Sequence, residues 1–223
     1  MANERNSMRF RVLALLLGLF IDAYGNSLTI MTNNGNGIWT AVAVDFNLLF
    51  GIAIPWTLFG FGILNIIINQ VLIRRFDLWR IGSGIVYMVF FSYFIDVFNR
   101  MNVALGITRV NTVVSLLLSL LGVLLIGIAI SMYQRANILM HPNDDTTNIL
   151  RFKYFHGSAI KAQFTDMGVI AILIIICSLY LHRIDAIGII TVVGFLLLGP
   201  IIQISDKLVL PKLKHNFSQN DDI

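Results

Sequence analysis

Long apolar stretches alternate with short polar segments along the whole chain. Six stretches lack or nearly lack charged residues and are close to the length that a helix needs to cross a hydrocarbon core of about 30 Å. They span approximately residues 10–31, 54–73, 79–98, 113–134, 166–182 and 185–204. This pattern predicts an all-α polytopic membrane protein with six transmembrane helices.

Two further segments interrupt this pattern. Residues 38–50 form an apolar stretch too short to cross a bilayer, directly after the Gly- and Asn-rich run 32–37. We expect a re-entrant or interfacial short helix here. The alternative that fits the same sequence is an ordinary external loop. The corresponding segment 139–157 is more polar, and Pro142 suits the start of a second short helix. A solvated loop is the alternative there.

The two halves of the chain resemble each other in sequence. Residues around 18–96 recur around 122–203 at offsets that drift from 104 to 107, although short apolar segments also match by chance. The aligned positions pair Gly18 with Gly122, Gly62 with Gly168, Gly82 with Gly188 and Trp39-Thr40 with Asn143-Asp144. Three spans per copy force the second copy to enter the membrane from the opposite face. We therefore predict two inverted three-helix repeats, as found in secondary transporters. They would occupy residues 10–98 and 113–204, joined by an external linker, 99–112, and flanked by cytoplasmic segments 1–9 and 205–223.

Composition supports a membrane location. The chain is 57% hydrophobic and 13% charged, with a mean hydropathy of +0.80, far too apolar for a soluble domain of 223 residues. With both termini inside, 13 of the 16 Lys and Arg residues lie on the cytoplasmic side. Arg100, Arg109 and Arg183 would lie outside, and Asp206, beside Lys207, is expected to be an inner-surface residue. The predicted localisation is the cell membrane with cytoplasmic termini, and the basic charge indicates lipid anchoring and not nucleic-acid binding.

The first span has an alternative reading as a signal peptide. A basic start precedes an apolar run, and Ala23-Tyr24-Gly25 suits cleavage between small residues. Its counterpart, the fourth span, lies mid-chain where no signal peptide can be. We therefore expect the first span to be retained.

Polar residues within the spans are candidates for a solute site, because burying an ionisable side chain in lipid costs roughly 3 kcal/mol or more. Asp22, Asn26 and Thr29 share one face of the first span with Gly18 and Gly25, so this face should point into the bundle. Asp22 would either bind a cation or proton, or hydrogen-bond to a neighbouring helix as a structural element.

Further candidates lie on other spans. Asn65 and Asn69 share a face of the second span, where they would line a polar cavity or join helices by hydrogen bonds. Gln203 corresponds to Asp96, whose own position near Arg100 favours an interfacial ion pair. Trp39, beside the Gly/Asn run, is either an interfacial anchor or a stacking surface for a ligand.

Signs of catalysis are lacking in the sequence. His141, His156, His182 and His215 have no metal-ligand spacing, Cys177 is the only cysteine, and no nucleophile elbow or phosphate loop occurs. We expect no enzyme activity, no metal and no cofactor.

Short motifs around each break resemble a known family. The first half has Ala23-Tyr24-Gly25, Asn34-Gly35 and Gly37-Ile38-Trp39-Thr40, and the second has Gly127-Ile128-Ala129, Ala136-Asn137 and His141-Pro142-Asn143-Asp144. In these positions the chain is similar to the YczE/YitT-type bacterial integral membrane proteins. The resemblance implies six helices and a permease-like description, with substrates mostly unassigned. Ile38 and Thr40 depart from the Pro and Asp often found in the family, so a role for that acidic position would persist only at Asp144.

These observations together favour a permease or exporter of a small polar organic solute, coupled to a proton or another cation. The expected site lies near mid-bilayer and comprises Asp22, Asn26, Asn33, Asn36, Trp39, Asn65, Asn69, Asp144 and Gln203. The alternative is a non-transporting accessory or scaffold protein that supports a biosynthetic or signalling complex. The expected partners are the lipid bilayer and the solute, with a second copy or another membrane protein as further options.

Overall fold

Six long helices form the body of the protein in a computed structural model that describes residues 6–35, 37–182, 184 and 187–217. No strand occurs among these residues. The long helices are α1 (Met8–Thr32), α3 (Ile54–Ile73), α4 (Leu78–Ala104), α5 (Thr112–Ala136), α7 (Ala159–Leu181) and α8 (Ile189–Leu208). All six are long and apolar enough to cross a membrane. The chain is therefore a multi-pass membrane protein.

Short helices complete the fold at its two ends. Helix α2 (Ile38–Phe50) follows α1, and α6 (Pro142–Ile149) follows α5 and continues into a π-helical turn, η2 (Leu150–Tyr154). A 3₁₀ turn, η1 (Ile107–Arg109), connects α4 to α5. The predicted short helices at 38–50 and after Pro142 thus both form.

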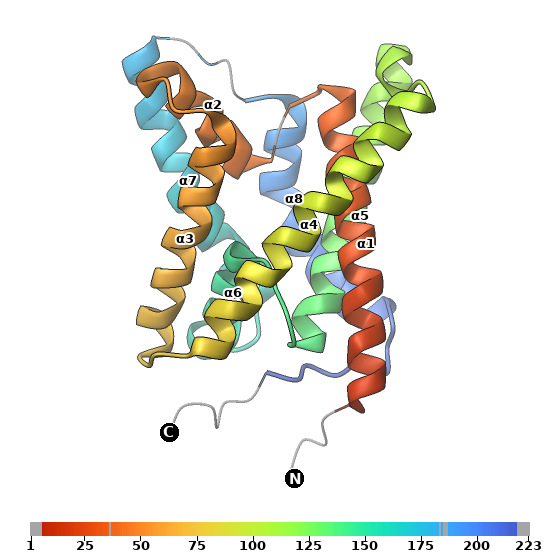
Figure 1. The fold of residues 1–223 in the computed structure, drawn as a ribbon, viewed down its shortest axis with the longest axis vertical. Coiled ribbons are helices and arrows are strands. Elements are labelled where there is room, and N and C mark those ends of the chain that lie inside the picture. The colour runs from red at the N-terminus through yellow and green to blue at the C-terminus, as the bar shows by residue number, and fades with distance from the viewer. Residues whose placement is uncertain (1–5, 36, 183, 185–186, 218–223) are drawn as a thin grey trace.

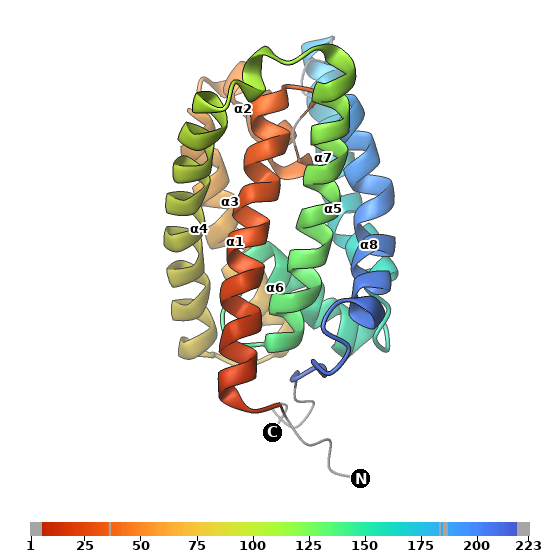
Figure 2. The ribbon, with the colours of Figure 1, turned by 90° about the vertical axis from the view of Figure 1, so that its right-hand side faces the viewer.

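The start of α1 and the segment that follows α8 lie at one end of the bundle, here called the termini end, with the far end opposite (Figure 1). Helices α1, α4 and α7 run from the termini end to the far end, and α3, α5 and α8 run back (Figures 1 and 2). Helix α2 lies toward the far end and α6 toward the termini end (Figure 1).

The helices pack as two groups. In the frame group, α1 packs against α4 and α5, and α5 packs against α8. In the short-helix group, α2 packs against α3 and α7, and α6 packs against the same two helices. The main contact between the groups is α7 against α8. Each group therefore combines helices from both halves of the sequence.

Glycines bring α1 and α5 into backbone contact. A Cβ atom added to Gly122 would lie 2.7 Å from the carbonyl oxygen of Gly25, and one added to Gly25 would lie 2.8 Å from the carbonyl oxygen of Gly122. No real side chain fits at such distances. Small residues allow close helix approach in membranes, where dispersion contacts and hydrogen bonds hold helices together.

An ion cluster closes the termini end of α5 and α8. Asp206 accepts a hydrogen bond from the Ser131 hydroxyl at 2.8 Å and forms ion pairs with Arg151 and, at 3.5 Å, with Arg135. The guanidinium of Arg135, 1% exposed, also donates to backbone carbonyls of the C-terminal segment, among them that of Leu213 at 3.1 Å. The interpretation of Asp206 as a simple inner-surface residue is therefore wrong, because its carboxylate is the acceptor of a buried cluster.

Several predicted helix ends are displaced. Helix α7 begins at Ala159 and not at 166, because its polar first turns bury Gln163 and Asp166 inside the protein. Helix α8 covers Ile189–Leu208 instead of 185–204, since its charged last turn joins the ion cluster. Helix α4 continues to Ala104, into the predicted linker, and residues 205–208 of the predicted tail are helical.

Candidate functional site

Asp22 lies near the middle of α1 with its carboxylate buried between helices. Its Oδ2 accepts a hydrogen bond from the Tyr87 hydroxyl of α4 at 3.1 Å, and its Oδ1 accepts one from Asn26 Nδ2 at 3.0 Å. The residue is 3% exposed. Because Gly18 and Gly25 bring α5 close to α1, the polar face of α1 points into the protein and away from lipid, as predicted.

A second carboxylate completes the arrangement from the other half of the chain. The Tyr133 hydroxyl of α5 donates to Asp144 Oδ2 of α6 at 2.6 Å. The Tyr87 and Tyr133 rings lie 5.3 Å apart, and the charge of Asp144 acts on Asp22. We call these four residues, Asp22, Tyr87, Tyr133 and Asp144, the Asp–Tyr chain. It links α1, α4, α5 and α6 between the middle of α1 and the last turn of α5.

Burial shifts the pKa values of ionisable groups around the Asp–Tyr chain. Burial raises the pKa of Asp144 to about 6, although the hydrogen bond from Tyr133 opposes the shift. Burial lowers the pKa of His141, the N-cap of α6, to about 4, so this imidazole is neutral at neutral pH. The charge of Asp144 also acts on Asp166 of α7, which is 8% exposed. A carboxyl group with a pKa near 6 can take up and release protons close to physiological pH.

Hydrogen bonds join α3 to α6 beside the Asp–Tyr chain. The Thr146 hydroxyl lies 2.9 Å from Asn65 Oδ1 and 2.7 Å from Asn69 Oδ1. Asn69 Nδ2 donates to the Pro142 carbonyl at 3.0 Å. Both predicted asparagines of the second span therefore bind the short helix α6, which accounts for their burial.

A cavity of about 340 Å³ lies at the termini end and includes Asp145, the sequence neighbour of Asp144, in its lining. Its lining residues are Met8, Arg11, Arg75, Asp77, Trp79, Arg80, Ser83, Asn137, Ile138, Met140 and Asp145. At its inner side Arg80 of α4 and Asp145 of α6 form an ion pair of 3.1 Å. A small neighbouring cavity shares Arg80 and Asp145 and reaches Asn69. Burial raises the pKa of Asp145 to about 6 even though Arg80 opposes this.

Three further predicted residues, Asn33, Trp39 and Gln203, lie apart from the Asp–Tyr chain. Asn33 is an exposed residue that ends α1 in the left-handed conformation at the far end. The ring of Trp39 packs edge-on against Phe61, 5.7 Å away, within the contact of α2 with α3. Gln203 lines a different cavity, between α7 and α8. Asn36 lies outside the described residues.

Sequence reasoning missed Tyr87, Tyr133, Asp145 and Asp166. An aromatic residue in an apolar span carries no signal of its own, since the hydroxyl acquires meaning only from a partner on another helix. Asp166 lies at the start of the predicted fifth span, where a charged residue suits a span boundary. Within the described part of the chain, no group of three or more His, Cys, Asp or Glu side chains is arranged to hold a metal ion.

The fold and the buried polar residues define the chain as a helical multi-pass membrane protein with ionisable groups inside its bundle. Comparison with known families then assigns it: residues 9–207 match a family of unknown function, DUF6198, and the chain belongs to that family. No curated protein and no solved structure matches the chain.

Proposed function

We propose that this protein is a permease or exporter for a small polar organic solute in a bacterial plasma membrane, built from two inverted three-helix repeats. The observation that carries the proposal is the Asp–Tyr chain, which joins one buried carboxylate from each half of the sequence. Ionisable groups inside membrane bundles are rare and typically mark solute or proton pathways.

Contacts between α1 and α5 support the inverted repeats. Adding the offset of 104 to Gly18 gives Gly122, and subtracting it from Ala129 gives Gly25. Gly18 faces the carbonyl oxygen of Ala129, and Gly122 faces that of Gly25. A two-fold axis in the membrane plane would exchange these two contacts.

Side-chain hydrogen bonds support the same relation. Ser27 donates to Asn99 at 2.6 Å, and the equivalent Ser131 donates to Asp206 at 2.8 Å. At the helix ends, Arg11 donates to the carbonyl oxygen of Ala136 at 2.7 Å, closing α5. In the equivalent position Ser115 donates to the carbonyl oxygen of Thr32 at 2.9 Å, closing α1.

The packing of the short helices follows the same exchange. Helix α2 of the first half packs on α7 of the second, and α6 of the second half packs on α3 of the first. They approach from opposite ends of the molecule (Figure 1). Irregular backbone and short helices occur at membrane depth where protein or a wet cavity surrounds them, as in transporters with inverted repeats.

The packing groups suggest how access to the site alternates. Because the sequence halves interleave, the bodies that move are the two packing groups and not the two sequence halves. The short-helix group would shift against the frame group, with the Asp–Tyr chain and the Arg80–Asp145 ion pair breaking and reforming between them. Protonation of Asp144 would neutralise its carboxylate, weaken its hold on the Tyr133 hydroxyl and so couple this shift to a proton.

Basic residues orient the molecule. The termini end carries Arg9, Arg11, Arg74, Arg75, Arg80, Arg135, Arg151, Lys153, Lys161, Lys207, Lys212 and Lys214. The far end carries Arg100 and Arg109 among the described residues. This asymmetry favours a cytoplasmic termini end.

Metabolite profiles of cells that express the wild type, Asp22→Asn or Asp96→Asn would test the transport proposal. Asp96 is the matched control, because the same substitution falls on an exposed ion pair near the far end, where the side chain is 59% exposed. Relative to cells that lack the protein, we expect the level of one solute to change in cells with the wild type or Asp96→Asn. It should not change in cells with Asp22→Asn. Proteoliposomes with an imposed pH gradient should then accumulate that solute.

An unchanged profile in all three strains would refute transport. Loss of a co-purifying protein on substitution of Arg74 and Arg75 would then indicate the accessory role.

Cysteine labelling would test the inverted insertion. Ile52 follows α2 and His156 follows η2, and both are exposed. Ile52→Cys and His156→Cys, each combined with Cys177→Ala, should react with an impermeant maleimide from opposite sides of the membrane. Reaction from one side by both variants would contradict the repeats.

A further inference from the structure

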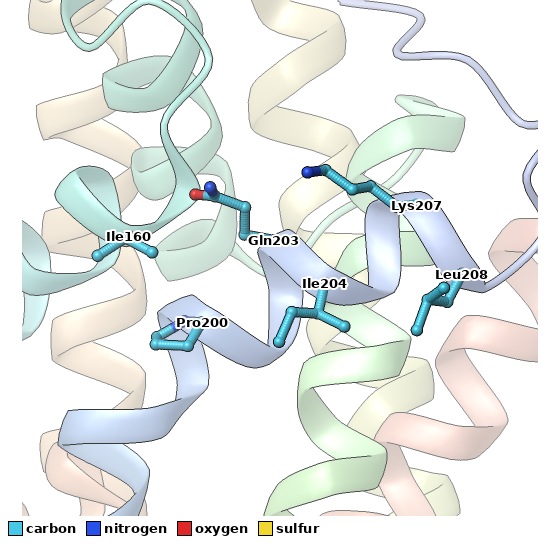
Figure 3. A pocket seen from close by; sticks show the side chains of 6 residues that line it. All are labelled: Ile160, Pro200, Gln203, Ile204, Lys207 and Leu208. Carbon is cyan, nitrogen blue, oxygen red and sulfur yellow. The ribbon is translucent and has the colours of Figure 1, made fainter.

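A proline shapes a separate cavity between α7 and α8 near the termini end. Pro200 lies inside α8, where its ring cannot donate a backbone hydrogen bond and displaces the carbonyl of the preceding turn. One residue earlier the two helices touch, since a Cβ atom on Gly199 would lie 3.1 Å from the Cα of Ile160. Beyond this contact a cavity of about 260 Å³ opens, lined by Ile160, Pro200, Gln203, Ile204, Lys207 and Leu208 (Figure 3).

The cavity is apolar, with two polar groups at one side. In Figure 3 the Gln203 amide points across the space toward α7, and the Lys207 ammonium lies one turn further along α8. Gln203 Oε1 is buried and has no hydrogen-bond partner. A buried acceptor without a donor is costly, so a bound group with an O–H or N–H is the expected complement. No acidic side chain occurs among the lining residues.

The position of the cavity identifies the kind of ligand. Ile204 and Leu208 are 57% and 72% exposed on the outer side of α8, where a bilayer would contact them. The far end of the same helix carries no such ammonium among its described residues. Basic pockets between transmembrane helices near the cytoplasmic surface bind anionic lipid headgroups.

We propose that this cavity binds one anionic phospholipid with a hydroxyl-bearing headgroup. The lipid phosphate pairs with Lys207, a headgroup hydroxyl donates to Gln203 Oε1, and an acyl chain fills the apolar space beside Pro200 and Ile204. Because α8 is the frame helix that contacts α7, the lipid would lie at the joint between the two packing groups. The site does not depend on whether the protein transports a solute.

Native mass spectrometry of the full chain in nanodiscs or detergent would test this site, with phosphatidylglycerol, phosphatidic acid and phosphatidylcholine as probes. We expect phosphatidylglycerol to bind most tightly. Lys207→Gln should weaken its binding about fivefold, as expected for the loss of about one lysine's worth of attraction. Lys212→Gln is the control, since it removes an exposed cation at the same end, outside the cavity.

Two further variants address the other contacts. Gln203→Leu should remove the preference for phosphatidylglycerol over phosphatidic acid, because only the former offers headgroup hydroxyls. Ile204→Trp should fill the cavity and reduce binding of every lipid without changing charge. Equal retention of phosphatidylcholine and phosphatidylglycerol by the wild type, or unchanged phosphatidylglycerol binding by Lys207→Gln, would overturn the proposal.

Discussion

Asp206→Asn is expected to destabilise the protein strongly, because it removes the negative charge from the ion cluster at the termini end. The introduced amide oxygen would still accept the Ser131 hydrogen bond, whereas the amide NH2 would replace the oxygen that accepts from Arg151. The substitution would leave Arg135 and Arg151, whose side chains are 1% and 5% exposed, without this counter-ion. Removing one partner of a buried ion pair costs about 3–5 kcal/mol, since the remaining charge stays desolvated.

This cost translates into a measurable melting shift. For a chain of this size each kcal/mol lowers Tm by about 2–4 °C, which gives a decrease of roughly 6–20 °C. Fluorescence-detected size exclusion after heating in detergent would measure it. Asp96→Asn is the control, because the Asp96–Arg100 pair is 59% and 80% exposed and worth about 0.3–0.5 kcal/mol.

If buried cations without a counter-ion cause the destabilisation, removing one of these cations should restore stability. Adding Arg151→Gln to Asp206→Asn removes one of the two cations that lost their partner, and we expect the double variant to regain part of the lost Tm. A decrease below about 2 °C for Asp206→Asn, the shift expected for less than 1 kcal/mol, or a double variant less stable than the single one, would refute the reasoning.

Three further predictions concern packing and protonation. Gly122→Ala should lower Tm and separate α1 from α5, because its Cβ atom would meet the Gly25 carbonyl oxygen at 2.7 Å; Gly60→Ala, with no atom within 4 Å, should be neutral or slightly stabilising. Asn69→Ala should cost about 1–3 kcal/mol by removing the hydrogen bonds that join Asn69 to Pro142 and Thr146 of α6, and hydrogen exchange should rise across Pro142–Ile149. The pKa of Asp144 is raised to about 6, so the folded state keeps a proton that the unfolded chain releases from about pH 4 upward. The unfolding free energy should therefore fall as pH rises from about 4 to 6, and Asp144→Asn should reduce that fall in a Tm series; an identical pH profile for this variant would exclude Asp144 as its source.

Much of the fold was predictable from hydropathy alone. Apolar length locates the six long helices, and the short helix Ile38–Phe50 begins and ends where the letters suggest. Errors occur where a helix carries buried polar residues. The first turns of α7 and the last turn of α8 look like surface segments, yet Asp166 and Asp206 become buried only after the chain has folded.

The candidate site was harder to predict. Asp22 and Asp144 stand out because charge is rare among apolar residues. Tyr87 and Tyr133 do not, since their hydroxyls matter only through partners on other helices, 65 residues away for Tyr87 and 11 for Tyr133. Asn33 and Gln203 satisfy the same compositional criteria as Asp22 but point elsewhere, which a linear pattern cannot reveal.

The interleaving of the two halves has a consequence for biogenesis. The ribosome completes α3 long before it reaches α6, so the amides of Asn65 and Asn69 enter the bilayer without the Thr146 hydroxyl and Pro142 carbonyl that later bind them. Helix α2 is likewise synthesised before α7, the helix against which it packs. A chain that ends after α4 would therefore lack the α6 partners of these amides, and we expect such a truncated chain to be less stable in the membrane than the full-length protein.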